Sequence, residues 1–426
     1  MFKLFTSLLV IALVAHDHST LAQSMNCIDD NEIDVVPKTI YSDLYRGQQS
    51  FSFNMLAAIQ HATPNANVFF SPYSTYHALL LAYFGARNHT EKELIEKLNL
   101  QWAKNKNHVA TAYHFEKRQR SMRSEKMPLE FASADKIFFA QEVKLTDCIT
   151  ALFFDELESM DFRSAAEQCR NDINGWISNI THNEIPEVLK SGDITPETQL
   201  VLANAAYFKG QWADQFDPKL TKDEVFYTNG GKQSFVPMMH KRGNYNLAID
   251  ERLGVHILEM PYITSKEEGK ASEISMIIIL PTFEKDSLEK VLEKLTPESL
   301  EQALKDSMLR EIDISLPKFK FEQSLELVPI LNSMGISSIF ESAADLSGFS
   351  TETKILFGDA RHVAKIKVDE EGSTAAAATV LFSFRSARPL EPTKFECNHP
   401  FLFLIFDSKA KAVLFTGIYR DPMTQK

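Results

Sequence analysis

The side chains that could do covalent chemistry in this chain are its serines, histidines, aspartates and cysteines. Twelve His with many Ser and Asp would permit a nucleophilic triad, but the sequence has no GxSxG elbow around a serine. It also lacks the HExxH zinc motif, the P-loop and the dinucleotide-binding fingerprint. The four Cys residues form no CxxC pair and have no nearby His at metal-ligand spacing. We therefore expect no enzyme activity, no metal and no cofactor, and keep a hydrolase only as an alternative.

The most unusual stretch lies near the C-terminus, where two acids and a glycine precede a run of small residues. Its members are Glu370, Glu371, Gly372, Ser373, Thr374, Ala375, Ala376, Ala377, Ala378 and Thr379. Local propensity alone favours a short helix here, with Ser373 as the N-cap and the alanines as the body.

The elements that would position this segment are helical in the first third of the chain and mostly strands after residue 200. Helices are predicted over residues 51–59, 72–85, 151–160, 171–180 and 325–334. Strands are predicted over residues 136–139, 200–208, 255–260, 275–280, 311–316, 362–368 and 402–406. Ser71 is the expected N-cap of the second helix, and Thr90 with Glu93 has the spacing of a capping box that opens another. Helices and strands thus fall in unequal blocks along the chain, and this order predicts a large α+β domain.

Length and composition set the class of protein. The chain has 426 residues, 44% of them hydrophobic, and a formal net charge of −12. Length alone suggests two to four domains, but no linker or internal repeat divides the sequence, so we expect one. The apolar fraction argues against disorder, and the acidic balance argues against nucleic-acid binding.

The first residues predict export from the cell. Lys3 precedes an apolar run over residues 4–15, and small residues follow at Ala22 and Ser24, which is the order of a cleaved secretory signal. Twelve apolar residues cannot span a hydrocarbon layer of roughly 30 Å. We expect a signal peptide over residues 1–22, a single domain over 23–426, and a secreted, monomeric product that does not bind membranes.

Secretion changes how two other patterns are interpreted. Asn88 and Asn179 each begin an N-x-Thr sequon and become candidate N-glycosylation sites. The four cysteines, Cys27, Cys148, Cys169 and Cys397, could form disulfides in three connectivities, among which the sequence does not choose.

Several longer motifs then resemble those of one family, the serpins. They are NVFFSPYS at 67–74, GARNHT at 85–90, NAAYFKGQW at 204–212, FDP at 216–218 with Thr221, VPMM at 236–239, LPKF at 316–319, ADLSG at 344–348, FECNHPFLF at 395–403 and LFTG at 414–417. The stretch 370–379 resembles the hinge of the reactive loop in inhibitory members. The motifs occur in the right order over nearly the whole chain past the signal.

This resemblance implies a fold and a mechanism. The fold has one main mixed sheet, two further sheets, about nine helices and an exposed reactive loop, here at about 370–395. In the mechanism a serine protease cleaves the loop and forms an acyl-enzyme, and the loop then inserts into the main sheet as a strand and traps the protease. The motif spacing is also similar to that of insect haemolymph serpins, which implies control of an extracellular immune cascade.

The hinge fits the physical demands of such an insertion. Side chains on an inserted strand alternate between its two faces, so Ser373, Ala375, Ala377 and Thr379 would share one face. An unpaired charge buried there would be costly, and a proline would remove a ladder hydrogen bond. From Gly372 to Phe384 neither occurs. We therefore favour an inhibitor over a non-inhibitory carrier or storage serpin.

The loop offers two candidate specificity residues. The commonest family spacing from Gly372 gives Ser386, and a loop shorter by one residue gives Arg385. A trypsin-like primary pocket holds an acid that pairs with a long cation, which favours Arg385. Arg388 is a third option, but Pro389 after it obstructs cleavage. The expected partner is a trypsin-like serine protease, held covalently.

The resemblance also assigns residues that control opening of the main sheet. Beneath its centre they are Ser71, Ser74, Asn204 and His362, and at its top Trp212, Thr221, Lys318 and Glu370, with a Lys318–Glu370 pair implied.

A separate basic cluster, Lys117, Arg118, Arg120, Arg123 and Lys126, could bind a glycosaminoglycan, or could be an ordinary solvated helix face. Helical spacing places Arg118 away from Arg120 and Arg123.

Overall fold

The computed structural model describes residues 39–228, 231–265, 267, 271–358, 360–372 and 391–424. Within them nine helices are α2 (Ile40–Ala62), α3 (Pro72–Gly85), α4 (Asn88–Lys97), α5 (Lys106–Ser124), α6 (Asp147–Leu152), α7 (Phe162–Ile180), α8 (Ser287–Lys294), α9 (Pro297–Lys305) and α10 (Leu327–Ser333). The expected signal peptide lies outside the described residues. Across the part that is described, no helix is long and apolar enough to cross a membrane.

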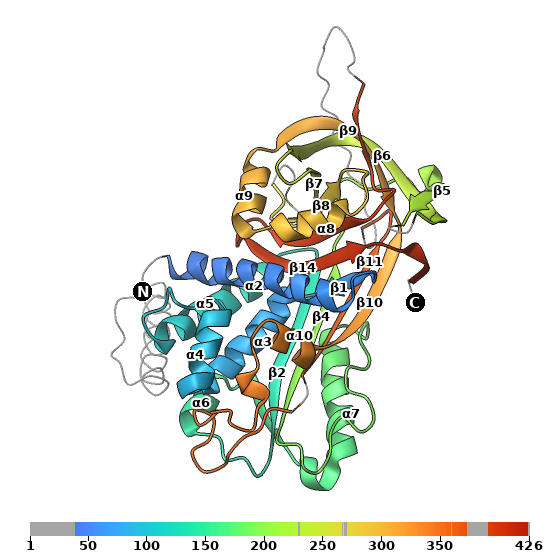
Figure 1. Cartoon of the computed structure of the whole chain (residues 1–426). Helices are drawn as coiled ribbons and strands as arrows, with labels where there is room; N and C mark the ends of the chain where they lie inside the picture. Colours follow the sequence, from blue (N-terminus) through green and yellow to red (C-terminus); the bar gives the residue numbers. More distant parts are fainter. Residues whose placement is uncertain are drawn as a thin grey trace, which may run out of the picture.

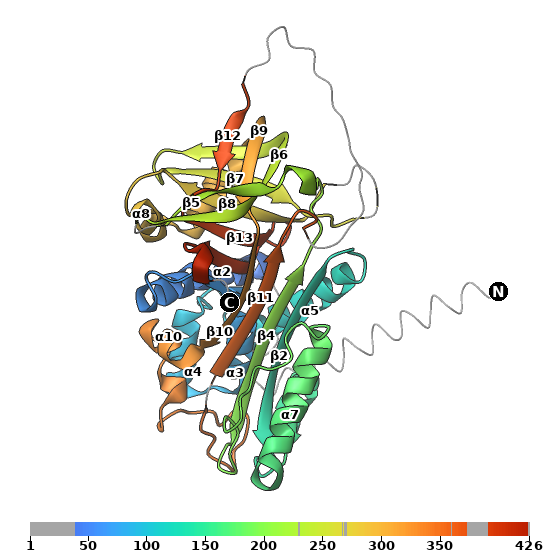
Figure 2. The same ribbon diagram turned by 90° about the vertical axis from the view of Figure 1, so that its right-hand side faces the viewer.

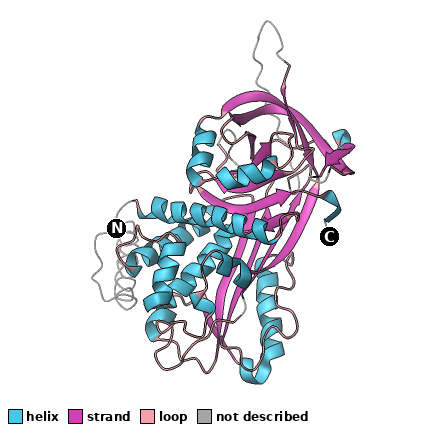
Figure 3. Ribbon diagram, in the orientation of Figure 1, coloured by secondary structure: helices cyan, strands magenta, loops and turns pink. Residues whose placement is uncertain are grey.

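The strands lie mostly in the second half of the chain and make up two hydrogen-bonded sheets (Figure 3). They are β1 (Val68–Phe70), β2 (Glu130–Ala140), β3 (Leu157–Met160), β4 (Leu200–Lys209), β5 (Lys222–Tyr227), β6 (Gln233–Asp250), β7 (Val255–Pro261), β8 (Ile274–Pro281), β9 (Met308–Pro317), β10 (Phe319–Glu326), β11 (Ala360–Val368), β12 (Thr393–Glu396), β13 (Phe401–Asp407) and β14 (Ala412–Tyr419). The α+β fold with a mixed main sheet is therefore confirmed.

The main sheet has five strands in the order β10-β11-β4-β2-β3. The pairs β11–β4 and β2–β3 are parallel, and the other two are antiparallel. Helices α2, α3, α4, α5 and α10 lie on one side of this sheet, and α7 lies on the other (Figures 1 and 2). Helix α7 packs at the β2 end of that second face, so no helix of the described part of the chain covers the outer side of β4, β11 and β10 (Figure 2).

The other nine strands form one continuous ladder, because β6 is long enough to join two parts of it. Its first residues pair with β5, its middle with β9, and its last residues with β7. The two further sheets that the resemblance implied are therefore connected through β6.

Helix α3 lies at the centre of the molecule and forms as the sequence predicted. All fourteen of its residues are buried, which is typical of a helix packed on every side. The Ser71 side chain caps its N-terminus by accepting a hydrogen bond from the Ser74 N–H at 3.1 Å, and Pro72 occupies the first turn. This helix places Ser71 and Ser74 directly beneath the main sheet.

Two local predictions are wrong. The helix expected over residues 151–160 ends at Leu152, and residues 157–160 form β3, because pairing with β2 outweighs local helix propensity. The capping box of Thr90 and Glu93 is also absent, since α4 already begins at Asn88. The Thr90 hydroxyl instead accepts a hydrogen bond from the Asp345 N–H, and Glu93 accepts those of residues 337 and 338.

Candidate functional site

The candidate site is the line between the parallel strands β4 and β11, which we call the seam. The two strands pair from Ala360 opposite Leu202 up to Lys365 opposite Tyr207. Pairing stops there, although β11 continues to Val368 and β4 to Lys209. We call the upper end, where the strands no longer pair, the mouth of the seam.

The mouth holds the start of the hinge in a fixed position. The Trp212 indole N–H donates to the Asp369 carbonyl at 2.9 Å, and the Phe216 N–H donates to the Glu370 carbonyl at 3.0 Å. The Trp212 N–H also donates to the Glu371 carbonyl at 3.2 Å. The backbone of residues 369–371 is thus held to the segment that follows β4.

Glu370 is the charged residue at the centre of the mouth. Its carboxylate lies 2.6 Å from the Lys318 ammonium and accepts a hydrogen bond from the Thr221 hydroxyl at 2.7 Å. Burial alone would raise its pKa, but the hydrogen bonds from Lys318 and Thr221 outweigh burial and lower it. The structure therefore brings together Trp212, Thr221, Lys318 and Glu370, which the resemblance assigned to the top of the sheet.

Gly372 is the last hinge residue that the structure describes, and its conformation leaves little room for a side chain. Its φ is +86°, and an added Cβ would lie 2.4 Å from the Trp212 nitrogen and 2.6 Å from the Gly210 oxygen. Both neighbouring atoms belong to backbone that is held by the contacts of the mouth. Gly372 therefore sets how closely the hinge approaches the sheet.

We expect Gly372→Ala to lower the free energy of unfolding by about 1–3 kcal/mol, because the left-handed backbone and the close contact both become strained. Gly175→Ala is the control, since nothing lies within 4 Å of a Cβ added there in α7. That change should raise stability by up to about 1 kcal/mol. Urea denaturation of both variants checks this, and equal midpoints would contradict the strain argument.

Beneath the middle of the seam lies a buried polar cluster. The Asn204 amide donates to the Ser74 hydroxyl at 2.7 Å, and its oxygen contacts the Nδ1 atom of His362. The Ser71 N–H donates to the Nε2 atom of His362 at 2.9 Å. His362 and Asn204 are register partners on β11 and β4, so their side chains join the two strands. All four residues predicted for this cluster are in contact.

Asp135 of β2 is a member of the cluster that sequence reasoning missed. It accepts hydrogen bonds from the hydroxyls of Ser74 at 2.5 Å and Ser133 at 2.6 Å, and also contacts Asn204. Burial raises its pKa and lowers the pKa of His362 to about 3, so His362 is neutral at physiological pH. The sequence pattern that could have identified Asp135 is strand alternation, because it places Asp135 on the same face as the buried Ile137 and Phe139.

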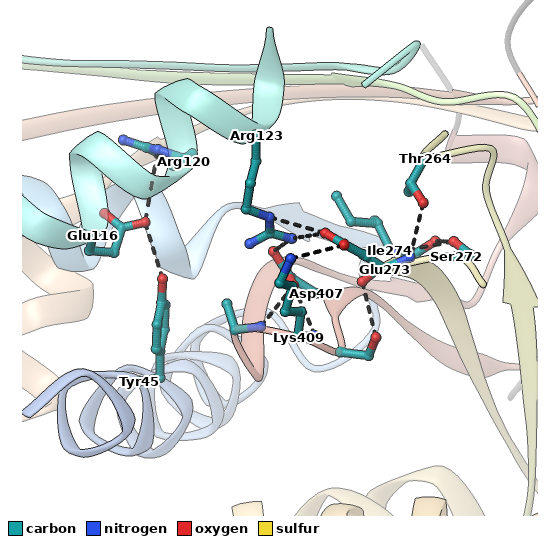
Figure 4. A network of polar contacts seen from close by, with 12 residues as sticks. Tyr45, Glu116, Arg120, Arg123, Thr264, Ser272, Glu273, Ile274, Asp407 and Lys409 are labelled. Atoms are coloured by element: carbon teal, nitrogen blue, oxygen red, sulfur yellow. Dashed lines mark hydrogen bonds and ion pairs between the residues drawn. The ribbon is translucent and has the colours of Figure 1, made fainter. Parts of the chain in front are cut away.

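The five residues of the predicted basic cluster do not form one free surface. Arg123 pairs with Asp407 at 2.8 Å and with Glu273 at 3.0 Å, and Arg120 lies 3.9 Å from Glu116 (Figure 4). Lys117 contacts Asp155 and Glu156, while Arg118 and Lys126 are exposed. Three of the five cations are thus already paired with carboxylates, and glycosaminoglycan binding stays an untested prediction that this arrangement does not favour.

The two candidate glycosylation sites lie on the surface. Asn88 and Asn179 are both exposed, and the Asn88 amide donates to the Asp345 carboxylate at 2.6 Å. Cys148 is disulfide-bonded, while Cys169 and Cys397 are free and buried. Among the described residues no group of three or more His, Cys, Asp or Glu is placed to hold a metal ion.

Residues 373–390 of the predicted loop lie outside the described residues, among them hinge residues 373–379, both candidate specificity residues, Arg385 and Ser386, and also Arg388 and Pro389. The end of the loop, expected at about residue 395, overlaps strand β12 (Thr393–Glu396). What the structure fixes is the two ends of the loop. Before the loop, β11 of the five-stranded sheet ends at Val368; after it, β12 pairs in parallel with β9 of the nine-stranded sheet.

Comparisons with known proteins agree with this architecture. A family model described as serpin (serine protease inhibitor) matches residues 46–422. The Drosophila melanogaster protein named serine protease inhibitor 88Ea is 54% identical, over 90% of this chain and 92% of its own. Human serpin B3 is 34% identical, over 89% of this chain and 100% of its own.

Solved structures show the same fold at low sequence identity. A crystal structure of maspin has a TM-score of 0.80 at 23% identity, covering 90% of this chain and 100% of maspin. Uncleaved ovalbumin has a TM-score of 0.77 at 24% identity, covering 89% of this chain and 100% of its own.

Proposed function

Because this chain belongs to the serpin family of serine protease inhibitors, we propose that it is a secreted suicide-substrate inhibitor of trypsin-like serine proteases. The observation that supports the proposal is the seam. Two central strands pair in parallel, stop pairing before they end, and hold the start of the hinge at the mouth. That arrangement suits a sheet that has yet to take up another strand.

The strand directions supply a driving force for uptake. A segment that turned back after β11 would run antiparallel to β11, and also to β4, because these two strands are parallel. It would replace one parallel pairing by two antiparallel ones, which are somewhat more stable per residue. The mainly small residues of the hinge would enter without burying an unpaired charge.

The chemical step would start as in substrate cleavage. The protease serine Oγ attacks the Arg385 carbonyl carbon, the bond from that carbon to the Ser386 nitrogen breaks, and the protease histidine gives a proton to the leaving amine. An ester then links the protease serine to Arg385. Insertion of the freed hinge carries the acylated protease along the sheet before water can hydrolyse this ester.

Secretion and glycosylation are further parts of the proposal. A disulfide at Cys148 favours an oxidising compartment, in agreement with the predicted signal peptide. The exposure of Asn88 and Asn179 suits glycosylation. Restraint of an extracellular immune cascade rests on the likeness to an insect protease inhibitor alone.

Incubation with trypsin tests the proposal. We expect a complex that survives a denaturing gel, and a released C-terminal peptide that mass spectrometry finds to begin at Ser386. A peptide beginning at Ala387 would keep the mechanism and move the specificity residue to Ser386. Loop cleavage that leaves trypsin, chymotrypsin-like and elastase-like enzymes fully active would favour the alternative, a non-inhibitory carrier or storage serpin.

A further inference from the structure

The segment that links α7 to β4, residues 181–199, crosses the outer face of the seam. It is held firmly to α7, because the Asn174 side chain accepts hydrogen bonds from the N–H groups of Val188 and Leu189, each at 3.0 Å. Its apolar side chains Ile185, Val188, Leu189 and Ile194 are buried. This connector and α7 therefore form one packed unit on the sheet.

Two carboxylates of the connector reach strand β11. The Lys365 ammonium lies 2.8 Å from the Glu184 carboxylate and donates to the Glu184 carbonyl at 2.7 Å. The Arg361 guanidinium donates to Asp193 at 3.0 Å. In the Arg361–Asp193 pair both side chains are covered, at 14% and 13% exposed, so solvent screens this contact less than an ordinary surface pair. In the other pair Lys365 is 14% exposed and Glu184 is 42% exposed, so that contact is more open to solvent.

Glu184 links the connector to β11 at the upper end of the paired part of the seam. The hydrogen bond from Lys365 is the main cause that lowers the pKa of Glu184. Lys365 and Tyr207 are register partners, and they form the last rung before the mouth. Asp193 contacts Arg361, which lies on β11 four residues before Lys365 and pairs with Ala203 of β4. The connector thus holds the paired part of the seam near both of its ends.

A strand entering the seam would separate these partners. Neighbouring strands lie about 4.8 Å apart, so an added strand moves β4 and β11 to about twice that distance. The connector runs directly into β4, so it could then no longer keep Glu184 on Lys365 and Asp193 on Arg361 without rearranging. A strand that enters from the mouth meets this rung first.

We propose that Glu184 and Asp193 form a clamp across the seam, and that their release from Lys365 and Arg361 controls how fast a further strand enters the sheet. The inference rests on the proposed function, because it concerns the insertion on which inhibition depends. The clamp would therefore influence whether the protease is trapped or released, because slow insertion gives water time to hydrolyse the acyl-enzyme.

The test needs no protease. The full chain is incubated with a synthetic peptide that has the sequence of residues 373–385, and uptake is followed as the rise in thermal stability with time. We expect Glu184→Gln and Lys365→Met each to speed uptake about tenfold, and the double variant to be no faster than the faster single variant. Asp193→Asn should speed uptake as well, and provides a second route if Lys365→Met fails to fold.

The chain offers a matched control. The Lys136–Glu158 pair has a similar distance, 2.9 Å, and a similarly covered lysine, 15% exposed, but joins β2 to β3 and does not cross the seam. Glu158→Gln should leave the uptake rate within twofold of the wild type. Equal rates in the wild type and all three clamp variants would overturn the clamp and leave the proposed function standing. Absence of uptake in every protein, the wild type included, would overturn both.

Discussion

Replacement of Arg385 by alanine is expected to weaken inhibition of trypsin by about a thousandfold or more. A site built around a buried acid discriminates strongly against a residue that leaves the acid unpaired. Arg385→Lys should retain most of the inhibition, because lysine also places a cation in the pocket. The measurement is the second-order rate constant for loss of trypsin activity.

Two comparisons make the Arg385 prediction specific. Arg388→Ala is the matched control, since it removes a loop arginine whose following bond involves Pro389 and is therefore obstructed. Arg388→Ala should leave the rate constant for trypsin inhibition within about twofold of the wild-type value. A large loss for Arg388→Ala with none for Arg385→Ala would show that the bond is misassigned. Arg385→Leu should further direct inhibition towards proteases with apolar primary pockets, which a change in overall stability could not do.

A single charge in the hinge should convert the inhibitor into a substrate. The strands beside the seam carry small buried side chains, among them Ala203, Ala206 and Ala364, and the His362–Asn204 contact spans it. A carboxylate brought there by insertion would lose its hydration without gaining a partner. Because successive residues face opposite sides of a strand, either Ala376→Glu or Ala377→Glu must point towards the core.

The expected result is that one of these two variants forms at least tenfold less trypsin complex, while its loop is cleaved at the wild-type rate. Ala376→Ser and Ala377→Ser are the controls, because they add a hydroxyl without a charge and should still trap the protease. The ratio of complex to cleaved chain on a denaturing gel gives the answer. If both glutamate variants form the complex as well as the wild type, insertion is not the trapping step.

The sequence predicted the parts of the fold that are specified locally. Ser71 and Pro72 predicted the start of α3 because cap and first turn depend on adjacent residues. Residues 157–160 were misassigned because their strand exists only through pairing with β2, which no local pattern carries. The motif matches placed Lys318 and Glu370 in one site, and the structure gives their contact.

Other residues of the site could not be predicted, because their roles depend on contacts between distant segments. Glu184 and Lys365 are 181 positions apart, and nothing in the connector sequence marks Glu184 among the chain's many acids. Asp135 needed both the strand alternation of β2 and the position of α3 to be recognised as a partner of Ser74. Family motifs give the residues that line the seam, whereas the clamp follows only from three-dimensional contacts.

The parallel pairing of β4 with β11 also changes what stability means for this molecule. If a form with one more strand and a lower free energy exists, the active form is a long-lived state separated from it by a barrier. The stability of the active form is then described by its lifetime and not by an equilibrium free energy. An apparent melting temperature would then depend on the heating rate. A substitution that strengthens the core could shorten the active lifetime, if it stabilises the transition state of insertion more than the active form. Selection on such a chain would act on the height of a barrier, and Glu184 and Asp193 lie where that height is set.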